Sequence, residues 1–320
     1  LSRRDFKRIT NPLEQFGAKF ISNKKNSLPL KILGSEYLKP INYFEKRGSA
    51  QCKSSVILAA LNTPGKTTIV AKKSRNHTEL LLKHLKLPIK VLSKKKHDLI
   101  EITGQRQFKS FDYVIPGDMS SSAFFIVLTL LSKNSKLKIK NININPSRTG
   151  FIKIVNKMGA KVKFVNKRYN YGELIADVCV ASQRKFKAIK CPIELNSNAI
   201  DEFLIIFLIA SKASGVSYFK KLEELNKKES PRLKLASMIL KKMGVKTVTS
   251  KDSIKIFGNP NLKINKKILI NNFYKDHRIF MTSVIAALCF GGEWTIEDAE
   301  SHMSSFPSFL RILREIGCKF

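Results

Sequence analysis

The chain has 320 residues, of which 43% are hydrophobic, and this is enough for two domains with apolar cores. The formal net charge is +35, and the lysines are spread along the whole chain. The phenylalanines fall mostly within apolar runs, which argues against a nucleic-acid surface, where aromatic residues are interleaved with basic ones. The charge therefore indicates basic solvated faces, which would attract phosphorylated small molecules. No apolar run approaches the roughly 18 residues of a membrane span, and the first residues lack the apolar stretch of a signal peptide.

The cysteine pattern points to a reducing compartment. The five cysteines are Cys52, Cys179, Cys191, Cys289 and Cys318. Their number is odd, and no CxxC pair or cluster of cysteine and histidine is present, which argues against disulfides and against a zinc site. We therefore expect a cytoplasmic protein with reduced thiols and no bound metal.

The first part of the chain alternates short helices and strands. Residues 1–20 are predicted to form a helix and a turn, with Pro12 near the first helical turn and Gly17 near the C-cap. Further helices are predicted at 54–61, which a turn cluster at 62–65 closes, and at 77–85. Strands are predicted at 28–34, 40–48, 66–71, 97–104 and 110–119.

The alternation continues after Pro116-Gly117, which marks a unit boundary and a candidate crossing between domains. A helix is predicted at 121–132, a strand at 136–145, and a second helix at 147–159 with Ser147 as its N-cap. One further unit runs from about 198 to 258, and the last runs from about 272 to the end. Alternating short helices and strands favour an α/β fold.

One pattern recurs along the chain. Polar residues open an apolar run at 49–51, 119–121, 200–202 and 276–278, and each time a strand and a second amphipathic segment follow. The period is longer than that of solenoid repeats, so we expect βαβαββ-like units packed about a pseudo-symmetry axis. The openings would lie at helix N-termini, and several such ends aimed at one place would bind anions. The first 20 residues resemble the second half of such a unit, so we expect that upstream units are missing.

Charged residues stand at the predicted helix start near residue 201 and at the one near residue 228. Asp201 precedes the apolar run "EFLIIFLIAS", where an aspartate is either an N-cap or a carboxylate held as a general base. Lys228, Glu229 and Arg232 are predicted to open another helix, with Glu229 in its first turn. A solvated helix start is the simpler interpretation of this second group.

Two further helix starts carry polar residues, which are charged at one start and neutral at the other. Asp276, His277 and Arg278 precede a buried helix, where they form either a cap with an ion pair or an arginine fork for a carboxylate or phosphate. Ser49 and Gln51 offer neutral hydrogen-bond groups at the start of the helix after residue 49.

Taken together, these segments resemble the 5-enolpyruvylshikimate-3-phosphate synthases, and the resemblance covers the chain from end to end. The form with "SAQCKS" and "NTPG" is similar to the bacterial group noted for glyphosate tolerance. The matching stretches keep the family's order and approximate spacing: "LSRRDFKRITNPLEQFGA", "SAQCKSSVILAALNTPGKTTI", "SRNHTELLLKHL", "VIPGDMSSSAFFIV", "NPSRTGFIKIVNKMGA", "IDEFLIIFLIAS", "GVSYFKKLEELNKKESPRL", "DHRIFMTSVIAAL" and "SFPSFLRILREIG".

The resemblance implies the α/β enolpyruvyl transferase fold. In that fold two globular domains are built of repeated βαβαββ units around pseudo-threefold axes, and helix N-termini face the cleft between the domains. Residues 1–115 would form the C-terminal part of the first domain, whose upstream portion is missing, and residues 116–320 would form the second domain. The missing portion carries further substrate-binding segments in the family.

The resemblance also implies an activity, the transfer of the enolpyruvyl group of phosphoenolpyruvate to the 5-hydroxyl of shikimate 3-phosphate with release of phosphate. This is a step of the shikimate pathway toward chorismate and the aromatic amino acids, and it proceeds by addition and elimination through a tetrahedral intermediate. The family needs no metal or organic cofactor. Its partners are the two small-molecule substrates, with no nucleic acid and no membrane, and its members are usually monomers.

Site residues are assigned by matching position to the family. Asp201 is the expected base on the 5-hydroxyl, Glu229 the acid and base at the methylene group, and Lys228 the group beside the reacting oxygen. The residues matched to phosphoenolpyruvate binding are Arg4, Gln51, Arg232 and Arg278. The residues matched to shikimate 3-phosphate binding are Ser49, Ala50, Gln51, Ser74, Arg75, Asp201 and Lys228.

The chain departs from the family's pattern at several places near these residues. The departures are Pro231 and Asn226 around the K-E-S-x-R motif, Asn76 in place of an aspartate, Asp5 in place of a proline, and Ser304 where some members have lysine. None of them removes a proposed proton-transfer group.

Three alternatives remain open from the sequence. The enolpyruvyl transferase that acts on UDP-N-acetylglucosamine shares the fold but lacks the K-E-S-x-R helix start. A basic nucleic-acid-binding protein would need basic residues clustered with aromatic ones. A remnant that keeps the fold without catalysis is the third alternative.

Overall fold

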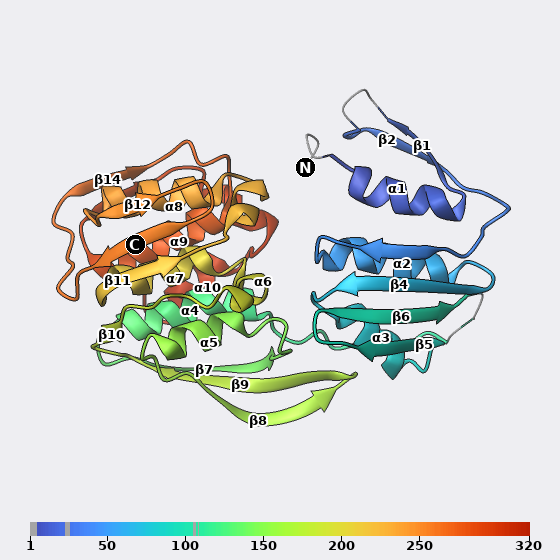
Figure 1. The fold of residues 1–320 in the computed structure, drawn as a ribbon. Coiled ribbons are helices and arrows are strands. Elements are labelled where there is room, and N and C mark those ends of the chain that lie inside the picture. The colour runs from blue at the N-terminus through green and yellow to red at the C-terminus, as the bar shows by residue number, and fades with distance from the viewer. Residues whose placement is uncertain (1–4, 23–25, 105–106, 108) are drawn as a thin grey trace. The chain divides into compact units, whose positions relative to one another are not determined.

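The computed structural model describes residues 5–22, 26–104, 107 and 109–320. The chain divides into two compact units (Figure 1). The first comprises Leu1–Ile115 with Tyr169–Glu173, and the second comprises Pro116–Arg168 with Leu174–Phe320. No helix in the described part of the chain is long and apolar enough to cross a membrane.

The first unit contains a helix with a hairpin, followed by a four-stranded sheet. The hairpin pairs β1 with β2 in antiparallel fashion, and the sheet has the order β3-β4-β6-β5. In that sheet β3 and β4 are parallel, and β6 runs antiparallel to both of its neighbours. The elements in chain order are α1 (Lys7–Phe16), β1 (Lys19–Ser22), β2 (Leu30–Leu33), β3 (Asn42–Glu45), α2 (Ala50–Leu61), β4 (Lys66–Lys72), α3 (His77–His84), β5 (Ile89–Ser93) and β6 (His97–Thr103).

The core of the first unit lies between α2 and one face of the sheet. Strands β4 and β6 alternate buried and partly exposed residues, which is the period expected of a sheet covered on one side. Side chains of α2 and of these strands that are fully buried are Val56, Ile57, Ile69, Ile100 and Ile102.

The second unit opens with a three-stranded sheet in the order β7-β9-β8. Gly117 forms a parallel bridge to Ile142 of β7, so the segment before α4 takes the place of a first strand. The elements of this part are α4 (Met119–Leu131), β7 (Lys136–Asn143), α5 (Gly150–Lys157), β8 (Lys163–Asn170) and β9 (Glu173–Ala181).

The rest of the second unit contains a four-stranded sheet in the order β10-β11-β13-β12 and a parallel pair, β14 with β15. Helix α7 is buried along its whole length, in keeping with its uniformly apolar sequence. The elements are β10 (Phe186–Lys187), η1 (Ile193–Leu195), α6 (Asn196–Ala199), α7 (Phe203–Ser211), β11 (Ala213–Phe219), η2 (Glu223–Lys227), α8 (Arg232–Lys242), β12 (Thr247–Thr249), β13 (Ile254–Gly258), β14 (Lys267–Ile270), α9 (His277–Phe290), β15 (Glu293–Ile296), η3 (Ala299–Ser304) and α10 (Phe309–Glu315).

The two four-stranded sheets are copies of one unit. Each has a parallel pair joined through a helix, followed by a second helix and two antiparallel strands. Gly104 follows the last strand of the first copy, and Gly258 is the last residue of that strand in the second. Both glycines lie against carbonyls at or just after the end of the first helix. A Cβ on Gly104 would lie 1.7 Å from the Thr63 carbonyl oxygen, and one on Gly258 would lie 2.1 Å from that of Ala213. The predicted βαβαββ repeat is therefore confirmed.

The predicted openings of the repeats coincide with the starts of α2, α4, α7 and α9. The predictions for α5 and α1 differ from the structure. Helix α5 begins at Gly150, and the Ser147 hydroxyl donates to the Asn145 side chain instead of capping a helix. Pro12 is the sixth residue of α1 and does not lie in its first turn.

The region before the second unit also differs from the prediction. Residues 110–119 form no strand apart from the bridge at Gly117, and Val114 and Ile115 are 70% and 82% exposed. Pro116 lacks the backbone N–H that a ladder needs, so the apolar run before it does not become a strand.

We expect Gly104→Ala to destabilise the protein by about 1–3 kcal/mol or more, because the added Cβ meets backbone that cannot move without shifting α2. The measurement is the free energy of unfolding in urea. Gly34→Ala is the matched control, since a Cβ there has nothing within 4 Å. Equal stability of the two variants would contradict the close approach of β6 and α2.

Candidate active site

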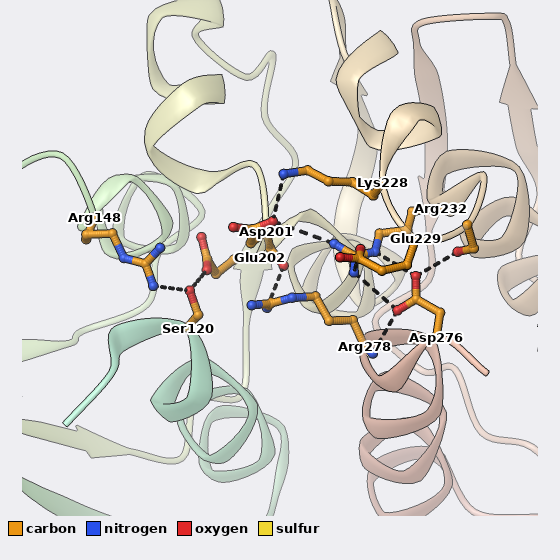
Figure 2. Close-up of polar contacts among 10 residues, drawn as sticks. Ser120, Arg148, Asp201, Glu202, Lys228, Glu229, Arg232, Asp276 and Arg278 are labelled. Atoms are coloured by element: carbon orange, nitrogen blue, oxygen red, sulfur yellow. Dashed lines mark hydrogen bonds and ion pairs between the residues drawn. The ribbon is translucent and has the colours of Figure 1, made fainter. Parts of the chain in front are cut away.

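In the second unit Asp201 contacts three of the other predicted site residues (Figure 2). Asp201 lies just before α7, and its Oδ1 atom is 3.1 Å from Lys228 Nζ and 3.6 Å from Arg232 Nη1. The Arg278 guanidinium, from the first turn of α9, donates to the backbone carbonyl of Asp201 at 2.9 Å. One aspartate is thus placed among an ammonium and two guanidinium groups.

Arg232 is the most buried of these cations, with only 1% of the residue exposed. Its Nε and Nη2 atoms donate to the two carboxylate oxygens of Asp276 at 2.9 and 3.3 Å. Its Nη2 atom also donates to Glu229 Oε2 at 2.5 Å. A buried guanidinium needs such partners, because an uncompensated charge in the interior is very costly, and its planar fork suits a bidentate carboxylate.

Asp276 both caps a helix and forms a structural ion pair, as one of the two interpretations of its sequence position predicts. Its Oδ1 atom accepts from the backbone N–H of Arg278 and caps α9, while its Oδ2 atom accepts from the Ser230 hydroxyl. Burial raises the pKa of Asp276, but the Arg232 guanidinium and these hydrogen bonds outweigh burial and hold the pKa below its ordinary value of 3.8. Asp276 is therefore a carboxylate that keeps Arg232 in place.

The start of α8 differs from the sequence prediction. The helix begins at Arg232, with Pro231 before it, so Lys228 and Glu229 precede the helix and do not lie in its first turn. A proline disfavours helical backbone in the residue before it, and this excludes Ser230 from the helix. The Glu229 side chain is 41% exposed, and it reaches Arg232 from this preceding segment. Asp201 is likewise outside the helix that it was predicted to cap, and Glu202 takes the N-cap position of α7.

A second polar network was not predicted. The Ser120 hydroxyl at the start of α4 donates to the Glu202 carboxylate and accepts from Arg148 Nη2, and Arg148 also pairs with Asp118. Burial raises the pKa of Glu202, the Asp201 charge adds to this rise, and the Arg278 charge opposes it. Two features of the sequence could have indicated this network, namely the repeated helix opening at 119–121 and the acidic pair at 201–202.

The first unit holds the other predicted residues at the start of α2. The Ser49 hydroxyl caps this helix by accepting from the Cys52 N–H at 3.3 Å. The preceding loop is fixed by the buried Glu45 carboxylate, which accepts the N–H groups of residues 47, 48 and 49. Ala50 and Gln51 form the first turn of α2, and Gln51 is exposed there.

Ser74 and Arg75 link β4 to α3, close to the start of α2. The Lys53 ammonium of α2 donates to the Arg75 carbonyl at 2.9 Å. The Ser74 hydroxyl oxygen is buried and has no hydrogen-bond partner among the residues that the structure describes. An unpaired buried hydroxyl costs free energy, which a bound ligand that supplies the partner would recover.

The predicted residues therefore form two groups, one in each unit. The second unit brings together Asp201, Lys228, Glu229, Arg232 and Arg278. The first unit brings the Ser49–Gln51 turn next to Ser74 and Arg75 through Lys53. Arg4 lies outside the described residues.

Comparison with known proteins gives the family. The model of the family described as EPSP synthase (3-phosphoshikimate 1-carboxyvinyltransferase) matches residues 1–313. The chain belongs to this family. The resemblance seen in the sequence is thereby confirmed over nearly the whole chain.

Relatives and solved structures agree with this membership. The 3-phosphoshikimate 1-carboxyvinyltransferase of Caldicellulosiruptor bescii is 39% identical over 98% of this chain and 72% of the relative. That of Zymomonas mobilis is 35% identical over 100% of this chain and 71% of the relative. An EPSP synthase structure from Acinetobacter baumannii has a TM-score of 0.86 at 32% identity, over 98% of this chain and 71% of that one.

A more distant structure shows the fold alone. The enolpyruvyl transferase NikO from Streptomyces tendae has a TM-score of 0.75 at 14% identity and covers 100% of this chain and 72% of that one. The predicted enolpyruvyl transferase fold is confirmed by these structures, and the matches favour the EPSP synthases over the UDP-sugar alternative. The roles of individual residues remain predictions.

We expect Asp276→Asn to lower the free energy of unfolding by about 3–5 kcal/mol at neutral pH, because it leaves the buried Arg232 charge without its main partner. The folded-state pKa of Asp276 is lowered, so its contribution is present above the ordinary pKa of 3.8 and is lost as the pH falls through the lowered value. Urea unfolding at several pH values between about 3 and 7 measures this difference.

Glu224→Gln is the control for this experiment, since Glu224 pairs with Lys227 on the surface and both side chains are more than half exposed. We expect it to change stability by less than about 1 kcal/mol. A difference between wild type and Asp276→Asn that stays constant as the pH falls would contradict the ion-pair account.

Proposed function

We propose that the protein transfers the enolpyruvyl group of phosphoenolpyruvate to the 5-hydroxyl of shikimate 3-phosphate and releases phosphate. The observation that carries the proposal is the meeting of Asp201 with three cations, Lys228 and Arg232 at its carboxylate and Arg278 at its backbone carbonyl. Membership of the EPSP synthase family supports the same activity. We also infer, from the family, a cytoplasmic location and a monomeric state.

The addition step requires a base and an acid. In our proposal Asp201 takes the proton of the 5-hydroxyl while that oxygen forms a bond to C2 of phosphoenolpyruvate. Glu229, which takes up a proton once it is free of Arg232, gives this proton to the C3 methylene, which becomes a methyl group, and a tetrahedral intermediate results. The Lys228 ammonium, 3.1 Å from Asp201, stabilises the negative charge near the reacting oxygen.

The elimination step reverses the proton transfer at carbon. Glu229 takes a proton from the methyl group, the C2–C3 double bond forms again, and the bond from C2 to the phosphate oxygen breaks. The phosphate leaves with the proton that Asp201 had taken. Atoms and charge balance over the two steps, and both carboxylates return to their starting states.

The arginines supply fixed positive charge for the anionic groups of phosphoenolpyruvate. Arg232 is almost fully buried and already holds Glu229 and Asp276, so we infer that a substrate anion reaches it by taking the place of one of them. Glu229 is the exchangeable partner, because its side chain is 41% exposed while that of Asp276 is fully buried. We infer that phosphoenolpyruvate displaces Glu229 from Arg232 and frees it to act at the methylene.

The first unit would bind shikimate 3-phosphate through Ser49, Ala50, Gln51, Ser74 and Arg75. The buried Ser74 hydroxyl, which has no protein partner in the described part of the chain, supports this assignment. The start of α2 adds backbone N–H groups and the positive end of a helix, which favour a phosphate group. Arg4 and Gln51 remain assigned to phosphoenolpyruvate by the family pattern.

The direct test is phosphate release from phosphoenolpyruvate with either shikimate 3-phosphate or UDP-N-acetylglucosamine as the acceptor. We expect phosphate release when shikimate 3-phosphate is the acceptor and none when UDP-N-acetylglucosamine is the acceptor. Asp201→Asn should lower kcat by about 10²- to 10⁴-fold, because it removes the base and keeps the shape of the side chain.

Asp112→Asn is the matched control, since Asp112 is exposed in the first unit and should leave kcat unchanged. Circular dichroism and the unfolding midpoint establish that the Asp201 variant is folded. An Asp201→Asn variant that is folded and within threefold of wild-type kcat would remove Asp201 from the mechanism. Turnover with the UDP-sugar instead would overturn the proposed substrate.

A further inference from the structure

Lys53 is a lysine without solvent contact in a chain whose lysines mostly lie on the surface. It sits in the first turns of α2 and is 0% exposed. Its Nζ atom is 2.6 Å from Oε1 of Glu79, which is 3% exposed in the first turn of α3. The same Nζ atom donates to the Arg75 carbonyl at 2.9 Å.

These contacts connect segments that are separate in the sequence. Lys53 belongs to the helix that begins after Ser49, whereas Arg75 and Glu79 lie in and after the loop that follows β4. A contact of 2.7 Å between the hydroxyls of Ser54 and Thr78 joins the same two helices. The start of α2 and the loop with Ser74 and Arg75 are therefore held to each other by buried polar groups.

Stability alone does not account for this arrangement. A buried ion pair contributes little net free energy, because the desolvation of both charges offsets their attraction, and apolar side chains of similar volume often serve as well. An apolar pair would not supply the hydrogen bond to the Arg75 carbonyl. The Lys53 ammonium therefore fixes the backbone of the loop through a hydrogen bond, which apolar packing cannot provide.

The buried position of the Ser74 hydroxyl also indicates that the loop is held in place. This hydroxyl is buried without a hydrogen-bond partner among the described residues, and a loop free to relax would turn it toward water or a neighbour. A loop that is already ordered also loses less conformational entropy when a ligand binds.

We propose that Lys53 and Glu79 are positioning residues that hold Ser74 and Arg75 against the start of α2 for the binding of shikimate 3-phosphate. The inference rests on the proposed function, which assigns that ligand to this loop. Glu79 holds the Lys53 side chain in place, and Lys53 acts on the loop through the Arg75 carbonyl.

The test compares three variants by calorimetric titration with shikimate 3-phosphate and by steady-state kinetics. Lys53→Met with Glu79→Met replaces the ion pair by apolar side chains and leaves no unpaired buried charge. We expect this double variant to fold, with Kd and KM for shikimate 3-phosphate raised about 10- to 100-fold and KM for phosphoenolpyruvate within threefold of wild type. Lys53→Met alone should in addition lose stability, because Glu79 stays buried without a partner.

Glu101→Gln is the matched control, because it removes a carboxylate of the same unit that pairs with the exposed Lys66 and leaves Lys53 and Glu79 unchanged. We expect its affinity for shikimate 3-phosphate to stay within threefold of wild type. A double variant that binds shikimate 3-phosphate as tightly as wild type would overturn the positioning role. An equal loss for both substrates would overturn it as well, since that result indicates general unfolding of the site.

Hydrogen–deuterium exchange of the backbone amides at 73–78 separates this inference from the proposed function. The double variant should exchange faster there than wild type, while Glu101→Gln should not. If wild-type protein binds no shikimate 3-phosphate, the proposed function fails, and the exchange result still decides whether Lys53 holds the loop. Unchanged exchange in the double variant would overturn the positioning pair whatever the ligand.

Discussion

The candidate site depends on one buried guanidinium. Arg232 contacts the carboxylates of Asp201, Glu229 and Asp276, which lie before α7, before α8 and at the cap of α9. A charge buried to this degree requires these partners, so the beginnings of three helices are fixed relative to one another by a single side chain. The short K-E-S-x-R segment therefore has a structural role as well as a proposed chemical one.

The same contacts link folding to catalysis. The fully buried Asp276 holds Arg232 in place, whereas the more exposed Glu229 is the partner that we propose exchanges with a substrate anion. Asp201 lies between these groups and Lys228, where a base on a hydroxyl would be needed. Asp276 is a buried charge that holds Arg232, a residue assigned to substrate binding. In our proposal the buried pair of Lys53 and Glu79 has the same role in the first unit, where it holds the loop with Ser74.

Much of this arrangement could be predicted from the sequence, because it depends on local patterns. Polar residues ahead of apolar runs marked the starts of α2, α4, α7 and α9, and the motifs identified the family and the charged residues around Asp201. The network of Ser120, Arg148 and Glu202 could not be predicted, since its hydrogen bonds join residues 28 and 82 positions apart. The burial of Lys53 could not be predicted either, because lysines are expected on the surface.

The most direct measurement is the steady-state kinetics of Arg232→Lys with both substrates. A lysine keeps the charge but has no planar fork to hold Asp276 and Glu229 together, so the account predicts a fall in kcat/KM for phosphoenolpyruvate of about 100-fold or more. Lys234→Ala, an exposed position on the same helix, should leave the kinetics unchanged. A folded Arg232→Lys variant within threefold of wild type would contradict the central role of this guanidinium.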